Sequence, residues 1–151
     1  MIELKGNYDL FNLPQNNEAI CIPTNGSIRK NGCAIMNNNI AQQADYKFNL
    51  SARLGQYINT YGNRAFNMGK CINGQNSFTV FTLPTKHHWK EENDVTLICK
   101  SCEQLVEMCN KFNITKCYLV SQSISNGELH WENILKPWLQ LILDDRFVVI
   151  T

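Results

Sequence analysis

Short apolar runs alternate with stretches of helical periodicity along this chain. A run of about 4–8 apolar residues bounded by turn-forming residues predicts a strand that is buried on both faces. Four such runs are residues 20–24, residues 78–83, Cys117–Val120 and Phe147–Ile150. Strands of this kind that alternate with helices are typical of a layered α/β fold.

Helices are predicted between these strands. Apolar residues recur at intervals of three and four over Val95–Phe112, and Asp94 is placed to cap the first turn of that helix. A second helix is predicted over residues 32–47, although three consecutive asparagines weaken it. Apolar residues within 134–142 mark the last helix, and Pro137 must lie near its start because a proline inside a helix costs about 3 kcal/mol.

Two further strands are predicted in the middle of the chain, over residues 57–61 and 65–68, and a Gly-Asn pair between them indicates a hairpin. An Asn-Gly pair within residues 71–75 indicates another turn. Pro84 is expected to end the strand that begins at residue 78.

Three strand ends open into loops that are rich in small or polar residues, namely residues 24–27, 84–89 and 121–131. In an α/β sheet, ligands bind beyond the carboxyl ends of the strands. Backbone N–H groups in such loops, and the amino termini of the helices that follow, attract anions. The three loops therefore predict a site that suits a diphosphate.

The composition fits one globular domain spanning residues 1–151. A formal net charge of +1 excludes a protein that holds nucleic acid mainly through charge, so a nucleic-acid substrate would be recognised through one nucleotide-sized pocket. We find no signal peptide and no segment apolar enough to span a membrane, and seven cysteines in such a chain indicate reduced thiols. We therefore expect a cytoplasmic protein without membrane partners. About 20 asparagines suit an AT-rich genome, such as many bacteriophages have.

Neither a metal nor a cofactor is expected. Cys99 and Cys102 have the spacing of a metal-binding pair, but no second pair or histidine follows at zinc-site distance. Both thiols lie on the apolar face of the predicted helix, so buried cysteines are the better interpretation. The sequence also lacks glycine-rich nucleotide-binding motifs and a serine nucleophile elbow.

The second loop, with the sequence LPTKHHWK at residues 83–90, resembles a motif of the macrodomain family, in its branch of DarG-type DNA ADP-ribosyl glycohydrolases. In that branch a Pro-Thr-Lys-basic-His-Trp type of motif ends a strand, and its lysine is catalytic. The third loop, SISNGELHW at residues 123–131, is similar to the family's Gly-Cys-Gly-Asn-Gly-Gly-Leu-Asp-Trp loop. The Asn, the Gly after it, the Leu and the Trp coincide.

The resemblance extends to the start of the chain. Asn25, Gly32 and Ala34 fall where the family has its ribose-binding asparagine and its glycine-rich loop. Gly6 and Asn7 are similar to the pair whose side chain approaches adenine in the family. The chain departs from the family in having Ser-Ile-Ser in place of Gly-Cys-Gly, and a glycine where a related glycohydrolase branch has a catalytic aspartate.

The resemblance implies a three-layer α/β/α macrodomain with a mixed central sheet. It places adenine near Asn7, the diphosphate against the first and third loops, and the distal ribose at Lys86. The candidate ligand-binding residues are Asn7, Asn25, Gly26, Gly32, Thr85, Ser123, Ile124, Ser125, Asn126, Gly127 and Trp131.

Lys86 is the candidate catalytic residue. The resemblance implies that it acts at the anomeric carbon of the ribose distal to adenine, where an unprotonated amine forms a covalent intermediate. Nearby positive charge from His87, His88 and Lys90 would favour the unprotonated amine. The alternatives are a surface lysine or a simple phosphate clamp.

His88 is a candidate acid–base partner, as is His130, because imidazole titrates near neutral pH. Glu128 is a candidate for activating a water molecule. In the simpler interpretation, His88 packs against Trp89, and the other two side chains face solvent.

The resemblance implies an ADP-ribosyl hydrolase whose partner is ADP-ribose or an ADP-ribosylated substrate, most plausibly nucleic acid such as DNA. Two alternatives stay open. One is a phosphatase acting on ADP-ribose 1″-phosphate, and the other is a non-catalytic protein that binds ADP-ribose or sequesters an NAD-derived signal nucleotide. A monomer is expected in each case.

Overall fold

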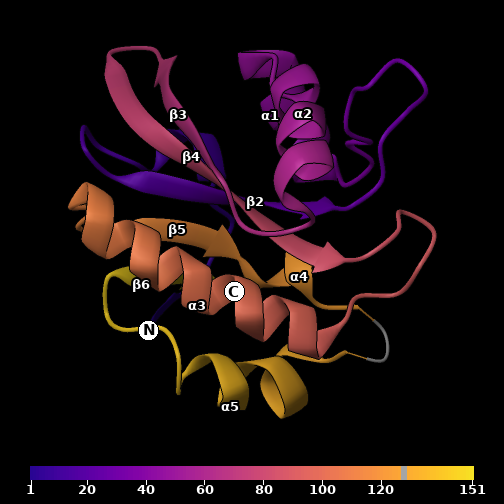
Figure 1. Ribbon diagram of the computed structural model, residues 1–151. Coiled ribbons are helices and arrows are strands. Elements are labelled where there is room, and N and C mark those ends of the chain that lie inside the picture. The colour runs from indigo at the N-terminus through magenta and orange to yellow at the C-terminus, as the bar shows by residue number, and fades with distance from the viewer. Residues whose placement is uncertain (127–128) are drawn as a thin grey trace.

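The computed structural model describes residues 1–126 and 129–151, which form three layers, with helices on both faces of a six-stranded sheet (Figure 1). The strands are β1 (Ile2–Leu4), β2 (Ala19–Asn25), β3 (Asn67–Asn73), β4 (Asn76–Lys86), β5 (Cys117–Val120) and β6 (Phe147–Ile150). The helices are α1 (Asn39–Phe48), α2 (Ser51–Tyr61), α3 (Val95–Phe112), α4 (Ser121–Ile124) and α5 (Lys136–Leu139), with a 3₁₀ turn at Leu10–Asn12 and a π-helical turn at Trp131–Leu135. The expected three-layer α/β/α fold is confirmed.

The sheet is mixed, as expected. Its strands lie in the order β1-β6-β5-β2-β4-β3, and all neighbours are parallel except the antiparallel pair of β3 and β4. Successive side chains of a strand point to opposite faces. In β6, Phe147 and Val149 therefore belong to the core cluster that also contains buried residues of α3 and α5, whereas Val148 and Ile150 belong to the cluster that contains buried residues of α1 and α2. These two pairs of helices lie on opposite faces of the sheet (Figure 1). The inner strands β5 and β6 are apolar throughout because both of their faces are covered.

Across the described residues, every helix is too short or too polar to cross a membrane. All seven cysteines are free thiols. Cys102 is fully buried on α3, and burial raises the pKa of its thiol well above the ordinary value. Cys21 and Cys117 bring their sulfur atoms within 3.1 Å of each other between β2 and β5. These thiols are core residues, as the apolar periodicity of the helix indicated for Cys102.

The helix predicted over Val95–Phe112 is confirmed with its cap. The Asp94 carboxylate accepts hydrogen bonds from the N–H groups of Thr96, at 2.9 Å, and Leu97, at 3.2 Å. Its second oxygen lies 2.9 Å from Nε2 of His87. One side chain therefore both starts α3 and fixes the loop that precedes it.

Removing this cap is expected to lower the free energy of unfolding. Asp94→Ala loses the acceptor for two N–H groups, which costs about 1 kcal/mol at neutral pH, whereas Asp94→Asn keeps an acceptor and should lose less. His87, with the N–H groups of Leu97 and Thr96, holds the pKa of Asp94 below its usual range. A lowered folded-state pKa stabilises the fold above the unfolded pKa of about 3.9 and loses this contribution as pH falls through the folded value. Urea unfolding at pH 7 and pH 3 should show the gap between wild type and Asp94→Asn closing at the lower pH.

The prediction of a helix over residues 32–47 is wrong in its first half. Helix α1 begins at Asn39, because the side chain of Asn38 accepts a hydrogen bond from the N–H of Ile40 at 2.9 Å and caps it there. The segment before the cap is a loop, in which Gly32 has a φ of +89°.

The strand predicted over residues 57–61 is also wrong, because these residues form the second half of α2. Leu54 and Ile58 lie one helical turn apart and are both buried in the core on that face of the sheet. Strand β3 begins at Asn67, and the hairpin turn that leads into β4 is at Gly74, with a φ of +68°. The Asn-Gly pair within residues 71–75 therefore marks the actual hairpin.

Pro84 lies inside β4 instead of ending it, in register with Thr24 of β2. The N–H of Thr82 points toward the β3 side, where it donates to the carbonyl of Phe66 at 2.9 Å. The nitrogen of Pro84, two residues on, points the same way but lies beyond the last pair of β3 with β4. Proline therefore removes no ladder hydrogen bond here, and the strand continues to Lys86.

Strand β1 is an element that the sequence patterns did not indicate. It pairs in parallel with β6 at one edge of the sheet. Its Glu3 carboxylate accepts a hydrogen bond from Nε1–H of Trp131 at 3.0 Å and forms an ion pair with Lys136 at 2.8 Å. The Lys136 ammonium, together with Trp131, lowers the pKa of Glu3. Contacts with residues more than a hundred positions away therefore hold this short strand.

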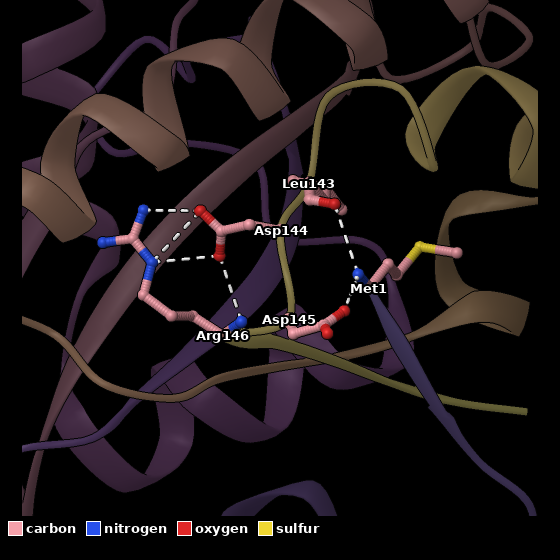
Figure 2. Close-up of polar contacts among 5 residues, drawn as sticks. All are labelled: Met1, Leu143, Asp144, Asp145 and Arg146. Carbon is pink, nitrogen blue, oxygen red and sulfur yellow. Dashed lines mark hydrogen bonds and ion pairs between the residues drawn. The ribbon is translucent and has the colours of Figure 1, made fainter.

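The segment that leads into β6 is held by a second set of polar contacts, shown in Figure 2. The amino group of Met1 donates to the carbonyl of Leu143 at 3.3 Å and lies 2.8 Å from the Asp145 carboxylate. Beside it, Arg146 forms an ion pair with Asp144 at 2.7 Å, which lowers the pKa of that carboxyl. These contacts fix the start of β6 next to β1.

Candidate functional site

A cavity of about 350 Å³ lies beyond the carboxyl ends of β2, β4 and β5. These strands are parallel, so their carboxyl ends share one edge of the sheet, and the loops that follow β2 and β4 extend to the same side in Figure 1. The three polar loops singled out in the sequence all contribute to the cavity. Its lining consists of Pro23, Thr24, Asn25, Ile35, Asn37, Asn38, Ala41, Thr85, Lys86, Trp89, Lys90, Glu91, Glu92, Asn93, Gln122, Ser123, Ser125 and Asn126.

Asn25 organises the first loop. It is buried, and its Nδ2 donates to the carbonyl of Ile35 at 3.0 Å and to Oδ1 of Asn37 at 3.1 Å. Its Oδ1 accepts from the N–H of Ser27 at 2.9 Å. Both amide protons are used in these bonds, so toward a ligand Asn25 offers the remaining lone pair of its Oδ1. The side chain closes the loop from residue 25 to residue 37 into one wall of the cavity.

The second loop is tied to the first through its backbone. The N–H of Trp89 donates to Oγ of Ser27 at 3.0 Å, and the carbonyl of Trp89 accepts from Nδ2 of Asn37 at 3.4 Å. A Cβ on Gly26 would lie 2.7 Å from the carbonyl oxygen of His87. Only a residue without a side chain permits this approach, so Gly26 acts in the site by letting the two loops meet.

Lys86 lies at the end of β4, where its half-buried side chain lines the cavity. A shift of register after Thr24, where β4 has the extra residue Thr85, brings Asn25 opposite Lys86. Asn63 fixes the backbone by donating from Nδ2 to the carbonyl of Lys86 at 3.1 Å. Within the described part of the chain, no residue forms an ion pair or hydrogen bond with the Lys86 ammonium group. Lys86 therefore lines the cavity without a polar partner for its amine among the described residues.

The charges of the side chains in the described lining cancel formally, because the two lysines Lys86 and Lys90 are matched by the two glutamates Glu91 and Glu92. The Lys90 ammonium lies 5.0 Å from the centroid of the Trp89 ring, a cation–π contact at the rim. In residues 1–126 and 129–151, no group of three or more His, Cys, Asp or Glu side chains is arranged to hold a metal ion.

The third loop starts with the single helical turn α4. Ser123 and Ser125 donate their hydroxyl protons to the carbonyls of Val120, at 2.7 Å, and Ser121, at 2.9 Å. A hydroxyl has one proton, so in this arrangement both serines present acceptors to the cavity. A diphosphate in the same place would require the hydroxyls to turn or backbone N–H groups to take over.

Two contacts join the third loop to the second. Asn93 donates from Nδ2 to the carbonyl of Ile124 at 2.9 Å. Asn126 donates from Nδ2 to the Glu92 carboxylate at 3.1 Å, while its Oδ1 accepts from the N–H of Leu129 at 2.8 Å. The amide of Asn126 is therefore used to position the loop across the mouth of the cavity.

Six of the residues predicted to form the site line this cavity, namely Asn25, Thr85, Lys86, Ser123, Ser125 and Asn126. Six others do not line it, namely Asn7, Gly26, Gly32, His88, Ile124 and Trp131. Gly127 and Glu128 lie outside the described residues. Whether any of these residues binds a ligand stays a prediction.

The residues away from the cavity have other neighbours. Trp131 and Ile124 are buried in the core beneath α3. The His88 ring stacks on Trp89, with centroids 6.1 Å apart, and its Nδ1 accepts from the N–H of Lys90. His130 is exposed. These placements agree with the simpler interpretation of each side chain.

Asn7 is exposed and follows the carboxyl end of β1, at the sheet edge that also carries the cavity. Two strands, β6 and β5, separate β1 from β2. The Asn7 side chain is thus on the expected edge but several strands from Lys86.

Several cavity residues were missed in the sequence. Asn37 was assigned to a helix, although the helix-capping preference of the neighbouring Asn38 marks the helix start after it. Glu92 and Asn93 stand between the lysine motif and the cap of α3, and nothing in their spacing distinguishes them from solvent-exposed loop residues. Their role follows from contacts with the third loop, more than 30 residues away.

No family model matches the sequence, and none of the curated proteins matches it significantly. Solved structures do match. The macrodomain of Thermus aquaticus DarG is similar with a TM-score of 0.72 and 18% identity, covering 99% of this chain and 97% of that one. The macrodomain of Mycobacterium tuberculosis DarG gives a TM-score of 0.73 and 20% identity, covering 99% and 97%. Thermosipho africanus DarTG in complex with ADP-ribose is similar with a TM-score of 0.75 and 15% identity, and the match covers 99% of this chain and 41% of that one. The fold of this chain is therefore that of a macrodomain, of the kind seen in DarG.

Proposed function

We propose that this chain is a single-domain, monomeric macrodomain of the DarG type that binds ADP-ribose in the cavity beside Lys86. We further propose that it hydrolyses the bond between the distal ribose and a modified substrate, with DNA as the foremost candidate. The single observation that carries the proposal is the position of Lys86, which lines the cavity formed by the three strand-end loops and whose amine has no ion pair or hydrogen bond to a described residue.

The resemblance of the lysine motif and the fold comparison support the same ligand independently. The motif was identified from residues 83–90 alone, and the comparison depends on the backbone of almost the whole chain. One of the similar structures is described as DarTG in complex with ADP-ribose. The cavity volume of about 350 Å³ lies within the range of about 300–1,000 Å³ that small-ligand sites occupy.

The proposed chemistry has two steps. The unprotonated amine of Lys86 attacks the anomeric carbon of the distal ribose, the bond from that carbon to the substrate breaks, and the leaving group takes a proton. Water then adds to the same carbon, the bond to Nζ breaks, and ADP-ribose leaves with a new hydroxyl. Asn25, Thr85 and the third loop orient the ribose and diphosphate during both steps.

A non-catalytic binder is the second candidate, and the state of the third loop favours it. Ser123 and Ser125 have already donated their hydroxyl protons to backbone carbonyls, and the charged residues of the cavity balance formally. Such a cavity stabilises negative charge less than one lined by free donors. Negative charge develops on the leaving group as its bond to the ribose breaks, so a cavity with few free donors there would slow hydrolysis.

The proposal is tested by calorimetry with ADP-ribose, followed by incubation with three substrates: ADP-ribosylated single-stranded DNA, ADP-ribosylated protein and ADP-ribose 1″-phosphate. Binding together with release of ADP-ribose from DNA is the expected result. Turnover of the phosphate alone would indicate a phosphatase, and binding without turnover would indicate the binder. Absence of ADP-ribose binding would contradict the whole proposal.

A further inference from the structure

A second cavity, of about 570 Å³, lies on the other side of the second loop. It is bounded by the residues around Asn63, by His87 and by the first three turns of α3. Lys86 lines the first cavity, and His87, the next residue, lines the second. The side chain of Asn63 bonds to the Lys86 carbonyl and also lines the second cavity. The two cavities are thus lined by consecutive residues, Lys86 and His87, next to the proposed reaction centre.

Among the described residues, the second cavity has a surplus of positive charge. Arg64 and Lys100 line it, and neither forms an ion pair with a carboxylate in the part of the chain that the structure describes. Asp94 is the acidic side chain in this lining, so two positive charges stand against one negative, and its carboxylate bonds to His87 and to the N–H groups of Thr96 and Leu97 instead of to either cation. The first cavity differs in this respect, because its two lysines are balanced by two glutamates.

The charge comes from side chains and not from the amino terminus of α3, because Asp94 already accepts from the first free N–H groups of the helix. A guanidinium and an ammonium that line the same cavity suit a phosphate: the arginine presents a planar fork of donors and the lysine a compact charge. Thr96, Ser101 and Gln104 add further hydrogen-bonding groups to the lining.

We propose that this second cavity holds a backbone phosphate of the nucleic-acid strand that carries the ADP-ribose. The inference rests on the proposed function, which places the scissile bond at Lys86, and goes beyond it by assigning a second binding site to the strand that carries the ADP-ribose. In this arrangement ADP-ribose occupies the first cavity. The nucleic-acid strand passes over the second loop at Lys86 and His87, and its next phosphate binds Arg64 and Lys100. This arrangement gives a chain with a net charge of only +1 a local hold on a polyanion.

The test uses a fluorescein-labelled single-stranded DNA oligonucleotide with one ADP-ribosylated base, its unmodified counterpart and an ADP-ribosylated mononucleoside. The double variant Arg64→Ala/Lys100→Ala should raise KM for the ADP-ribosylated oligonucleotide and Kd for both oligonucleotides about tenfold. It should also reduce the salt slope of binding by about 0.7, the contribution of one phosphate contact on a single strand. Its KM for the mononucleoside and its Kd for free ADP-ribose should stay within about twofold of wild type.

The matched control is Lys70→Ala/Lys116→Ala. It removes the same two charges from exposed positions near the amino ends of the parallel strands, where Lys70 pairs with Thr79 and Lys116 precedes β5. The proposed site is overturned if the control raises KM and Kd for the oligonucleotides as much as Arg64→Ala/Lys100→Ala does. It is also overturned if Arg64→Ala/Lys100→Ala raises KM for the mononucleoside as much as for the oligonucleotide.

The other outcomes separate the site from the proposed function. If wild type cleaves both substrates and Arg64→Ala/Lys100→Ala is unchanged on both, the site is wrong and the hydrolase stands. If wild type cleaves neither but binds the unmodified oligonucleotide through Arg64 and Lys100, the site stands and the hydrolase is wrong. Dependence on these two residues for an ADP-ribosylated peptide and not for the oligonucleotide overturns the assignment to nucleic acid.

Discussion

Lys86→Ala is expected to lower kcat for release of ADP-ribose by about 100-fold or more, which corresponds to about 2.7 kcal/mol of transition-state stabilisation. The amine is the group proposed to attack the anomeric carbon. Lys86 is the last residue of β4, whereas Lys90, the other lysine in the described lining, lies in the loop that follows. The Kd for ADP-ribose should change by less than about tenfold, because an ion pair made by a partly exposed side chain contributes only about 0.2–1 kcal/mol. Single-turnover release from ADP-ribosylated DNA and calorimetry with ADP-ribose measure the two quantities separately.

Two further variants make this test specific. Lys86→Arg keeps the positive charge but supplies a guanidinium that stays protonated, so it should bind ADP-ribose and remain inactive if the amine is a nucleophile. Activity in Lys86→Arg would instead assign Lys86 an electrostatic role. Lys90→Ala is the matched control. Lys90 is the other lysine that lines the first cavity, and its ammonium lies over the Trp89 ring. If Lys90→Ala and Lys86→Ala slow turnover equally, the mechanism proposed for Lys86 is wrong.

The parts of the fold that the sequence predicted are those specified by local pattern. The runs at β5 and β6 and the periodicity of α3 gave the observed bounds, because strands covered on both faces need apolar residues at every position. Asp94 was identified as a cap from its place before the first apolar residue of the helix. The convergence of the three loops followed from parallel pairing, since the carboxyl ends of parallel strands meet at one edge.

The errors have physical causes too. Residues 57–61 contain two tyrosines and an isoleucine, which favour strands by propensity. The apolar positions Leu54, Tyr57, Ile58 and Tyr61 nevertheless repeat with helical spacing, and tertiary burial of Leu54 and Ile58 decides for a helix. Strand β1 depends on β6 and on Glu3 contacts with Trp131 and Lys136, so no local pattern specifies it.

The candidate site was predicted in part for the same reason. Lys86 and Thr85 belong to one contiguous motif that follows a strand. The bond from Asn25 to Asn37 joins residues twelve positions apart in the first loop, and the bond from Asn126 to Glu92 spans 34 positions of the chain. Asparagine is equally common in turns that bind nothing, so its participation in these contacts is visible only once the loops are placed together.

The second large effect is expected at Gly55, where the usual rule for helices is reversed. Alanine is better than glycine in a helix interior by about 1 kcal/mol, and Gly55 lies within α2. A Cβ at this position would overlap the backbone carbonyl oxygen of Gly32, in the first loop. Because the obstacle is backbone on a buried face, the helix and the loop must separate, and overpacking of this kind costs about 1–3 kcal/mol.

Gly55→Ala should therefore lower the Tm by several degrees, at about 2–4 °C per kcal/mol for a domain of this size. It should also weaken ADP-ribose binding, because the displaced loop leads into the cavity wall. In that loop the N–H of Ala34 donates to the Ser51 carbonyl, and the carbonyl of the next residue, Ile35, accepts from Asn25. Gln56→Ala is the matched control, since it changes the next residue of the same helix at an exposed position and should leave both quantities unchanged. A Gly55→Ala protein that melts at or above the wild-type temperature would show that helix propensity dominates here, and that the first loop is not held by contact with α2.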